Sequence, residues 1–183
     1  MTSYRLPDLA PGSMTAEQQQ AYDAIKASPR GTVQGPLLAW LHSPALADRA
    51  QALGAFCRYH TSLPPRLSEL AIITTGAFWK AGFEWHVHAP IAIAAGLDPA
   101  AVEAVRTGGT PHFVEEDEQA VWRFAHHLLH DREVPDATYK TVETLLGPAA
   151  TVELVGVLGY YGLISMTIKA FNVPVPEGAA EPF

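Results

Sequence analysis

Prolines and glycines divide this sequence into segments of helical length, and this spacing constrains the fold more than any other feature. Ser43-Pro44, Asp98-Pro99 and Pro135-Asp136 each place helix-starting residues ahead of an apolar segment. Gly96 and Gly147-Pro148 fall where such segments end or restart. No strand-and-turn rhythm, GxGxxG motif or P-loop motif is present. The sequence therefore predicts an all-α fold.

Apolar spacings of three and four residues predict the individual helices. The expected helices cover residues 16–28, 44–60, 67–79, 83–95, 100–107, 115–131, 136–146 and 148–171, with a short apolar segment at 37–42. In the helix over 44–60, the spacing places Leu46, Ala50, Leu53 and Cys57 on one face. That face is expected to be buried.

The chain length of 183 residues fits one domain, here taken as 1–183. Pro7 and Pro11 lie in residues 1–14, which are expected to form an extended N-terminal arm. Residues 173–183 also contain prolines and are expected to form an extended tail. Because the first 14 residues lack an apolar core, a signal peptide is not expected.

Composition limits the classes of partner. Hydrophobic residues make up 48% of the chain and charged residues 17%, below the usual ~25% charged, so self-association is expected to cover apolar surface. A net charge of −7 without a basic cluster argues against nucleic acid or anionic lipid as a partner.

The apolar run 154–168 is short for a membrane span, so it is expected to form a buried core helix and to make no contact with a membrane. The single cysteine, Cys57, excludes an intrachain disulfide and a CxxC pair, and it suits a cytoplasmic protein.

The segment 67–96 holds the densest group of polar side chains among apolar ones. Glu84 and His88 are four residues apart and share a helix face, whereas His86 lies about 200° round from Glu84. Glu69 lies beside apolar residues on the preceding helix. One interpretation is an ordinary exposed helix pair, worth roughly a few tenths of a kcal/mol. In the other, the carboxylate raises the pKa of the imidazole and makes His88 a proton donor near neutral pH.

Two groups of side chains could hold a metal ion. His126 and His130 are four residues apart on an amphipathic helix, but such a pair is expected to be a surface feature. Glu69, Glu84 and His88 could form a site with two carboxylates and one histidine, an alternative that stays open. No metal is predicted.

A series of motifs runs in a fixed order through about residues 30–175. They are Gly35-Pro36-Leu37-Leu38, Ser43-Pro44-Ala45-Leu46-Ala47, Arg66-Leu67-Ser68-Glu69-Leu70-Ala71-Ile72, Phe83-Glu84-Trp85 with His88, residues 92–97, Val152-Glu153-Leu154, Gly159-Tyr160-Tyr161 and Phe171-Asn172-Val173. In this order and spacing they resemble the carboxymuconolactone decarboxylase family, which also contains the alkylhydroperoxidase-D-like proteins. The resemblance implies an orthogonal bundle of about eight helices.

The redox branch of this family carries a glutamate, a CxxC pair and a histidine four residues beyond the second cysteine. Counted from Glu69, the two cysteine positions fall on Ala81 and Glu84, and the histidine falls on His88. Both thiols are therefore missing, and Cys57 is expected to be a small core residue. Thiol peroxidase chemistry needs a thiolate and a resolving partner, so it is not expected.

The decarboxylase branch implies a cofactor-free carboxy-lyase of aromatic-compound breakdown. Its substrate is a lactone with a carboxylate at the γ-carbon. Loss of CO2 sends electrons into the unsaturated lactone, and the resulting dienolate is reprotonated on carbon. His88 would be the acid, Glu84 would orient or charge it, and Glu69 would relay protons or bind substrate. Arg66 and Lys80 are candidate cations for the anionic substrate, with the alternatives that Arg66 caps or bridges at a helix start and that Lys80 is solvated.

The pocket wall is less well defined by the sequence. The candidate substrate-binding residues are Arg66, His86, Phe83 and Trp40, and Leu37 and Phe78 are further candidates for the wall. For Tyr160 and Tyr161 core packing is expected, although a hydroxyl from either could reach the site.

Two other function classes stay open on the same scaffold. One is isomerisation or lactone hydrolysis by proton transfer, and the other is a non-catalytic oligomeric binding protein. The decarboxylase interpretation predicts that His88→Ala and Glu84→Gln abolish turnover and leave the fold intact. The resemblance also implies assembly as a homotrimer or homohexamer.

Overall fold

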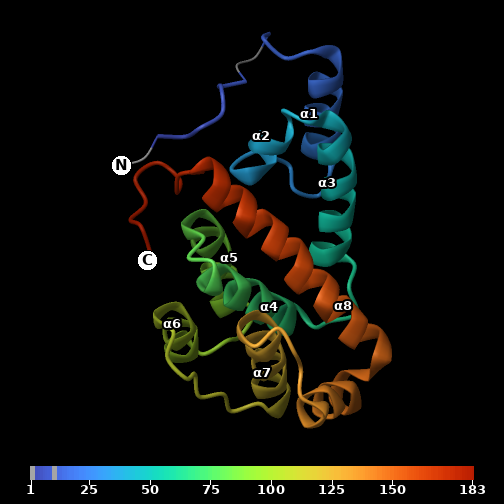
Figure 1. The fold of residues 1–183 in the computed structure, drawn as a ribbon, viewed down its shortest axis with the longest axis vertical. Helices are drawn as coiled ribbons and strands as arrows, with labels where there is room; N and C mark the ends of the chain where they lie inside the picture. Colours follow the sequence, from blue (N-terminus) through green and yellow to red (C-terminus); the bar gives the residue numbers. More distant parts are fainter. Residues whose placement is uncertain (1–2, 10–11) are drawn as a thin grey trace.

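The computed structural model describes residues 3–9 and 12–183, which form eight helices and no strand (Figure 1). The helices are α1 (Ala16–Ala27), α2 (Pro36–Trp40), α3 (Pro44–Tyr59), α4 (Pro65–Phe78), α5 (Gly82–Ala94), α6 (Pro99–Thr107), α7 (Glu116–His130) and α8 (Asp136–Phe171). The all-α prediction is confirmed. Of the expected N-terminal arm, residues 1–2 and 10–11, and so Pro11, lie outside the described residues, and residues 3–9 contain no helix.

The helix boundaries follow local chemistry. Thr15 and Gln18 form a capping box at the start of α1. At α6 the Asp98 side chain accepts a hydrogen bond from the Ala100 amide at 2.8 Å. The two helices expected over 136–146 and 148–171 join into the single α8, with a kink at Gly147, whose φ of 81° is non-helical (Figure 1).

Two groups of helices pack on α8. On one side α8 contacts α2 and α3, and on the other it contacts α4, α5 and α7 (Figure 1). The centre of the second group is α4, which packs against α5, α6, α7 and α8 and buries every residue from Leu67 to Gly76. A polar side chain on this part of α4 is therefore held in the core.

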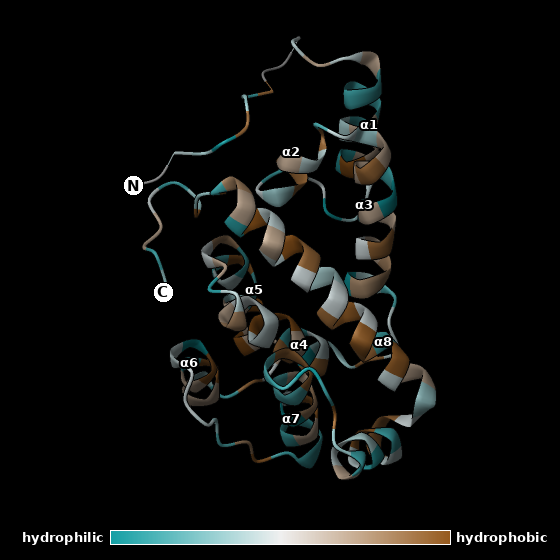
Figure 2. Ribbon diagram, viewed as in Figure 1, coloured by the Kyte–Doolittle hydropathy of each residue, from teal (hydrophilic) through white to brown (hydrophobic). Residues whose placement is uncertain are grey.

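The helix α8 is long and apolar enough, by length and composition alone, to cross a membrane. However, 56% of its most apolar window is buried inside the protein, and Leu154, Val157 and Leu158 are among its buried residues. Figure 2 shows hydrophobic residues along the long arm of α8 where it runs between the two helix groups. These features are those of a core helix.

The buried face of α3 differs from the expected one. Ala50 and Cys57 are buried as predicted, but Leu46 and Leu53 are 44% and 48% exposed. Ala47 and Gly54 take their places in the core. The reason is close packing: a side chain at Gly54 would collide with the Tyr160 hydroxyl and the guanidinium of Arg30. This close approach requires a glycine, and it rotates the larger leucines outward.

Candidate active site

The structure brings Glu69, Glu84 and His88 together. His88 lies between the two carboxylates, with its Nδ1 2.7 Å from Glu69 Oε2 and its Nε2 3.0 Å from Glu84 Oε1. All three side chains are buried, and His88 is only 2% exposed. The arrangement joins α4, which carries Glu69, to α5, which carries the other two residues.

The short turn between α4 and α5 sets the two helices in this register. The Ala81 amide donates a hydrogen bond to the Gly76 carbonyl at 2.9 Å, and Lys80 adopts a left-handed φ of 50°. Glu84 then falls in the first turn of α5, where the helix dipole favours a negative charge. His88 follows one turn later on the same face.

The charge state of His88 is set by two opposing effects. Burial favours the neutral imidazole and by itself lowers the pKa of His88. The charge of Glu84 and the hydrogen bonds to both carboxylates outweigh burial and raise the pKa from 6.5 to about 9. His88 is therefore an imidazolium at neutral pH, and it holds a proton on each ring nitrogen.

Glu84 and His88 open onto a cavity of about 250 Å³. Its walls come from the segment before α2 and from the helices α2, α3, α5 and α8. Glu69 is not part of the wall, so it supports His88 from behind. The site thus has one carboxylate and the imidazole facing the cavity, and a second carboxylate fixing the far ring nitrogen.

Two arginines that the sequence interpretation missed, Arg30 and Arg58, line this cavity. Arg30 donates to the Tyr160 hydroxyl at 3.2 Å, and its Nε is buried without a partner among the described residues. Arg58 follows Gly54 by one helical turn on α3, a signal that could have placed it near the core. No comparable signal exists for Arg30, which lies in the connection between α1 and α2.

Arg66, the predicted substrate cation, serves a different purpose. Its guanidinium pairs with Asp117 at 2.9 Å and with Glu118, so that it ties α4 to α7. It does not line the cavity. Lys80 also lies away from the cavity, in the turn before α5. The structure thus agrees with the bridging alternative for Arg66, and neither residue lies at the wall of this cavity.

The other predicted wall residues divide into two groups. Phe83 and Leu37 line the cavity. Trp40 does not, because its Nε1 donates to Thr167 at 3.0 Å and its ring packs in the core against Tyr160. His86 is exposed on the outer side of α5, as its position two residues from Glu84 requires, and Phe78 also lies elsewhere.

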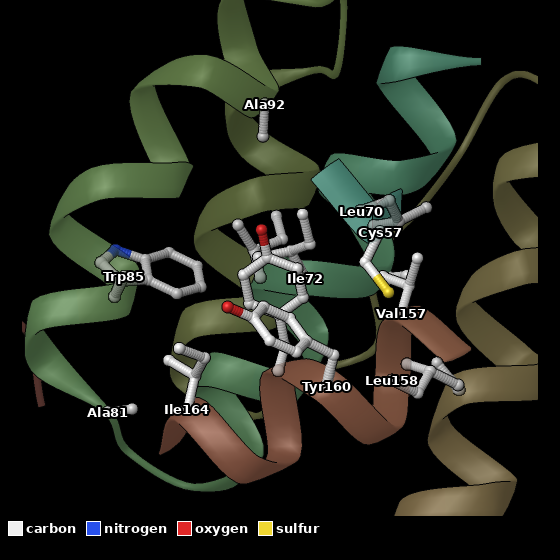
Figure 3. Packing of buried hydrophobic residues seen from close by; sticks show 14 of the residues in the cluster. Cys57, Leu70, Ile72, Ala81, Trp85, Ala92, Val157, Leu158, Tyr160 and Ile164 are labelled. Carbon is white, nitrogen blue, oxygen red and sulfur yellow. The ribbon is translucent and has the colours of Figure 1, made fainter. Parts of the chain in front are cut away.

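The region that would hold thiols in a peroxidase contains none. Ala81 is fully buried, and Glu84 occupies the second position. Cys57 lies in the apolar core beside Leu70 and Val157 (Figure 3). Burial raises the pKa of the Cys57 thiol, which disfavours the reactive thiolate.

The second histidine group is on the surface side of α7. The rings of His126 and His130 stack at 4.3 Å, and His127 contacts Asp131 at 2.8 Å. No group of three His, Cys, Asp or Glu side chains with metal-binding geometry occurs in the described part of the chain. At His88, each ring nitrogen is already paired with a carboxylate, so a metal could bind there only by displacing one of them.

Solved structures show the same fold. A protein of unknown function from Agrobacterium tumefaciens, named as a candidate antioxidant defence protein AhpD, is 14% identical with a TM-score of 0.66, covering 78% of this chain and 99% of its own. The debrominase Bmp8 without ligand is 16% identical with a TM-score of 0.67, covering 91% of this chain and 88% of its own. A cysteine-to-alanine variant of Bmp8 in complex with 2,3,4-tribromopyrrole is 15% identical with a TM-score of 0.74, covering 100% and 95%. At these identities the likeness establishes the fold alone, which is of the alkylhydroperoxidase-D-like type.

Sequence comparison adds the family. None of the curated proteins is a significant match to the sequence. Residues 44–127 match the model of the carboxymuconolactone decarboxylase family. This segment runs from α3 into α7 and contains Glu69, Glu84 and His88. Through this segment, and in agreement with its fold, the chain is similar to the carboxymuconolactone decarboxylase family.

Proposed function

We propose that this protein is a proton-transfer enzyme of the decarboxylase type, acting without a thiol or a cofactor on a small carboxylated lactone or ring compound. The observation that carries the proposal is the buried imidazolium of His88, held between Glu69 and Glu84 at the wall of a cavity. A buried, charged histidine at a cavity is a functional-site signal because its pKa departs strongly from its usual value. The family and the fold neighbours agree with a catalytic role.

The charges around the cavity favour an anionic substrate. Protonated His88 and the two arginines carry three positive charges, and the carboxylates of Glu69 and Glu84 carry two negative charges. The site therefore has one excess positive charge. The guanidinium groups of Arg30 and Arg58, which line the cavity, are the donors for a substrate carboxylate. A small ring compound also occupies the debrominase of similar fold, which was solved with a tribromopyrrole.

The proposed reaction balances with these groups alone. The substrate bond between the γ-carbon and the carboxylate breaks, CO2 leaves, and the electron pair moves into the conjugated lactone. The dienolate carbon then takes the Nε2 proton of His88, while Glu84 stabilises the imidazolium before transfer and Glu69 fixes the ring orientation. Water returns a proton to His88 after the product leaves.

Product analysis tests the reaction class. The protein is incubated with γ-carboxymuconolactone in D2O, and the expected product has lost CO2 and gained one deuterium on carbon. A product that keeps the carboxylate and differs from the substrate by at most deuterium would indicate isomerisation, and one that has gained D2O would indicate hydrolysis. Either result, or no turnover, would contradict decarboxylation.

A matched pair of arginine variants tests the anion site. Arg30→Met is expected to raise KM for the lactone about 10-fold or more, because a charged hydrogen bond to the carboxylate is lost. Arg66→Met removes an arginine that binds Asp117 and Glu118 instead, so it is expected to lower stability and leave KM unchanged. Equal KM values for the Arg30 variant and the wild type would refute the anion site.

We also propose self-association as a homotrimer or homohexamer. Several large apolar side chains are exposed on the packed helices α3 and α8, among them Leu53, Phe56, Val152 and Val155. A surface of this kind is typical of a subunit contact. Light scattering is expected to show an oligomer that Val155→Lys weakens. A wild-type monomer would contradict the proposal.

A further inference from the structure

The hydroxyl of Tyr161 has no hydrogen-bond partner among the described residues, although Tyr161 is only 1% exposed. Buried polar groups are almost always paired, because an unpaired one loses its bonds to water without replacement. The preceding residue shows the usual arrangement: Tyr160 is equally buried, and its hydroxyl accepts a bond from Arg30. The packing of the core would be served as well by a phenylalanine at position 161, so the Tyr161 hydroxyl has no structural role.

The position of Tyr161 is closely defined. Its ring packs edge-on against the His88 ring at 5.1 Å and against the Tyr160 ring at 5.2 Å. Tyr161, His88 and Glu84 line the same cavity. Two perpendicular ring contacts hold the side chain in place. The cavity that Tyr161 lines is therefore the place from which a partner for the hydroxyl can come.

The Tyr161 hydroxyl is neutral, and so a hydrogen-bond donor, at neutral pH. Burial raises the pKa of Tyr161 well above its usual value of 10, and the charge of Glu84 raises it further, against a smaller opposing effect of Arg58. A neutral phenol of this kind donates its proton to an acceptor and keeps it. The acceptor that benefits most is an oxygen carrying negative charge.

We propose that Tyr161 is a further catalytic residue, whose hydroxyl donates a hydrogen bond to the substrate carbonyl oxygen that becomes negative when the dienolate forms. The role rests on the proposed proton-transfer function. When the bond to the carboxylate breaks and CO2 leaves, the electron pair is delocalised onto the lactone carbonyl oxygen. Tyr161 stabilises that oxygen without losing its proton, and His88 then supplies the proton to carbon. A preorganised donor of this kind acts most strongly in a cavity closed to water.

Kinetics of Tyr161→Phe give the first test. Turnover of γ-carboxymuconolactone is expected to fall about 10²–10³-fold in kcat with little change in KM, as for the loss of one oxyanion donor. The matched control is Tyr139→Phe, which removes an exposed hydroxyl bonded to Glu143, far along α8 from the cavity. It is expected to leave kcat unchanged. An unchanged kcat in Tyr161→Phe would overturn the proposal.

Binding of 4-nitrophenol tests the donor without turnover. In the wild-type protein the absorbance of the bound probe is expected to show preferential binding of the phenolate. Tyr161→Phe is expected to weaken phenolate binding about 10-fold or more, because a hydrogen bond to a charged oxygen is lost. Equal phenolate binding in both proteins, or none in the wild type, would overturn the proposal. Phenolate preference without lactone turnover would reject the proposed decarboxylation and still support the Tyr161 donor.

The melting temperature of Tyr161→Phe is expected to equal or exceed that of the wild type, because the change removes an unpaired hydroxyl. If the variant does not fold, NMR of the wild-type protein still tests the proposed hydrogen bond. In the wild-type protein, the Tyr161 hydroxyl proton is expected to move downfield in the NMR spectrum when 4-nitrophenolate is added. A resonance that does not move would count against the proposed hydrogen bond.

Discussion

Two pairs of residues in this protein share one local geometry and differ in everything around them. Glu84 and His88 on α5 are four residues apart and 3.0 Å from each other, and His127 and Asp131 at the end of α7 have the same spacing and a distance of 2.8 Å. The first pair is 2–7% exposed, whereas the His127 and Asp131 side chains are 32% and 59% exposed. The first pair also has a third member, because Glu69 reaches the other ring nitrogen of His88.

The difference shows that burial, and not spacing, decides what such a pair can do. At α7, water and salt screen the charges, and the hydrogen bond from His127 lowers the pKa of Asp131. At α5, burial opposes the charge on His88, and two unscreened carboxylates still raise its pKa to about 9. Only the buried pair opens onto a cavity with arginines. The buried site is therefore suited to proton transfer and the exposed one is a surface feature.

The largest expected effect is on turnover. Glu84→Gln keeps the shape of the side chain but removes the charge that sustains the His88 imidazolium, so kcat is expected to fall about 10²–10⁴-fold. The matched change in the exposed pair, Asp131→Asn, is expected to leave kcat unchanged. Steady-state kinetics with the lactone measures both. Equal losses in the two variants would show that the comparison does not reflect function.

The next effect is on stability. His88→Gln leaves two buried carboxylates without their cation and is expected to cost about 3–5 kcal/mol of unfolding free energy. His127→Gln, on the surface, is expected to change little. Chemical denaturation of both variants measures the contrast. The sequence interpretation expects His88→Ala to leave the fold intact, whereas the buried ion pairs predict that this variant is destabilised. A His88 variant as stable as the wild type would show that the two ion pairs do not contribute to stability.

A smaller effect is the dependence of stability on pH. Because the folded-state pKa of His88 is raised from 6.5 to about 9, its contribution is fully present below pH 6.5 and is lost as the pH rises through about 9. The wild type is expected to lose at most about 3 kcal/mol of unfolding free energy across that window. The loss should persist in His127→Gln and disappear in His88→Gln. A wild-type stability that rises over this window would have the wrong sign.

Much of the fold and part of the site could be predicted from the sequence. Proline, glycine and capping residues such as Asp98 mark helix ends locally, so most boundaries were correct. Glu84 and His88 could be paired because their contact is within one helix. Glu69 was placed by the resemblance, since its contact with His88 spans two helices.

The rest depends on contacts between distant segments. From the sequence alone, Arg66 is a candidate cation for the substrate. In the fold, α7 places Asp117 and Glu118 beside Arg66, and its charge is paired there. Arg30 lies at the cavity beside Tyr160 of α8 and Gly54 of α3, and it donates a hydrogen bond to the Tyr160 hydroxyl. These contacts join segments that are far apart in the sequence. The exposure of Leu53 follows from the same close approach. No periodicity within one helix records such neighbours.

The protonation of His88 is the central claim, and an NMR titration of its imidazole tests it most directly. The His88 signals, identified by their absence in His88→Gln, are expected to keep the chemical shifts of a doubly protonated ring through neutral pH and to titrate near pH 9. The Glu84→Gln variant is expected to titrate at lower pH. A wild-type His88 that is neutral at pH 7, titrating at or below 6.5, would contradict the account.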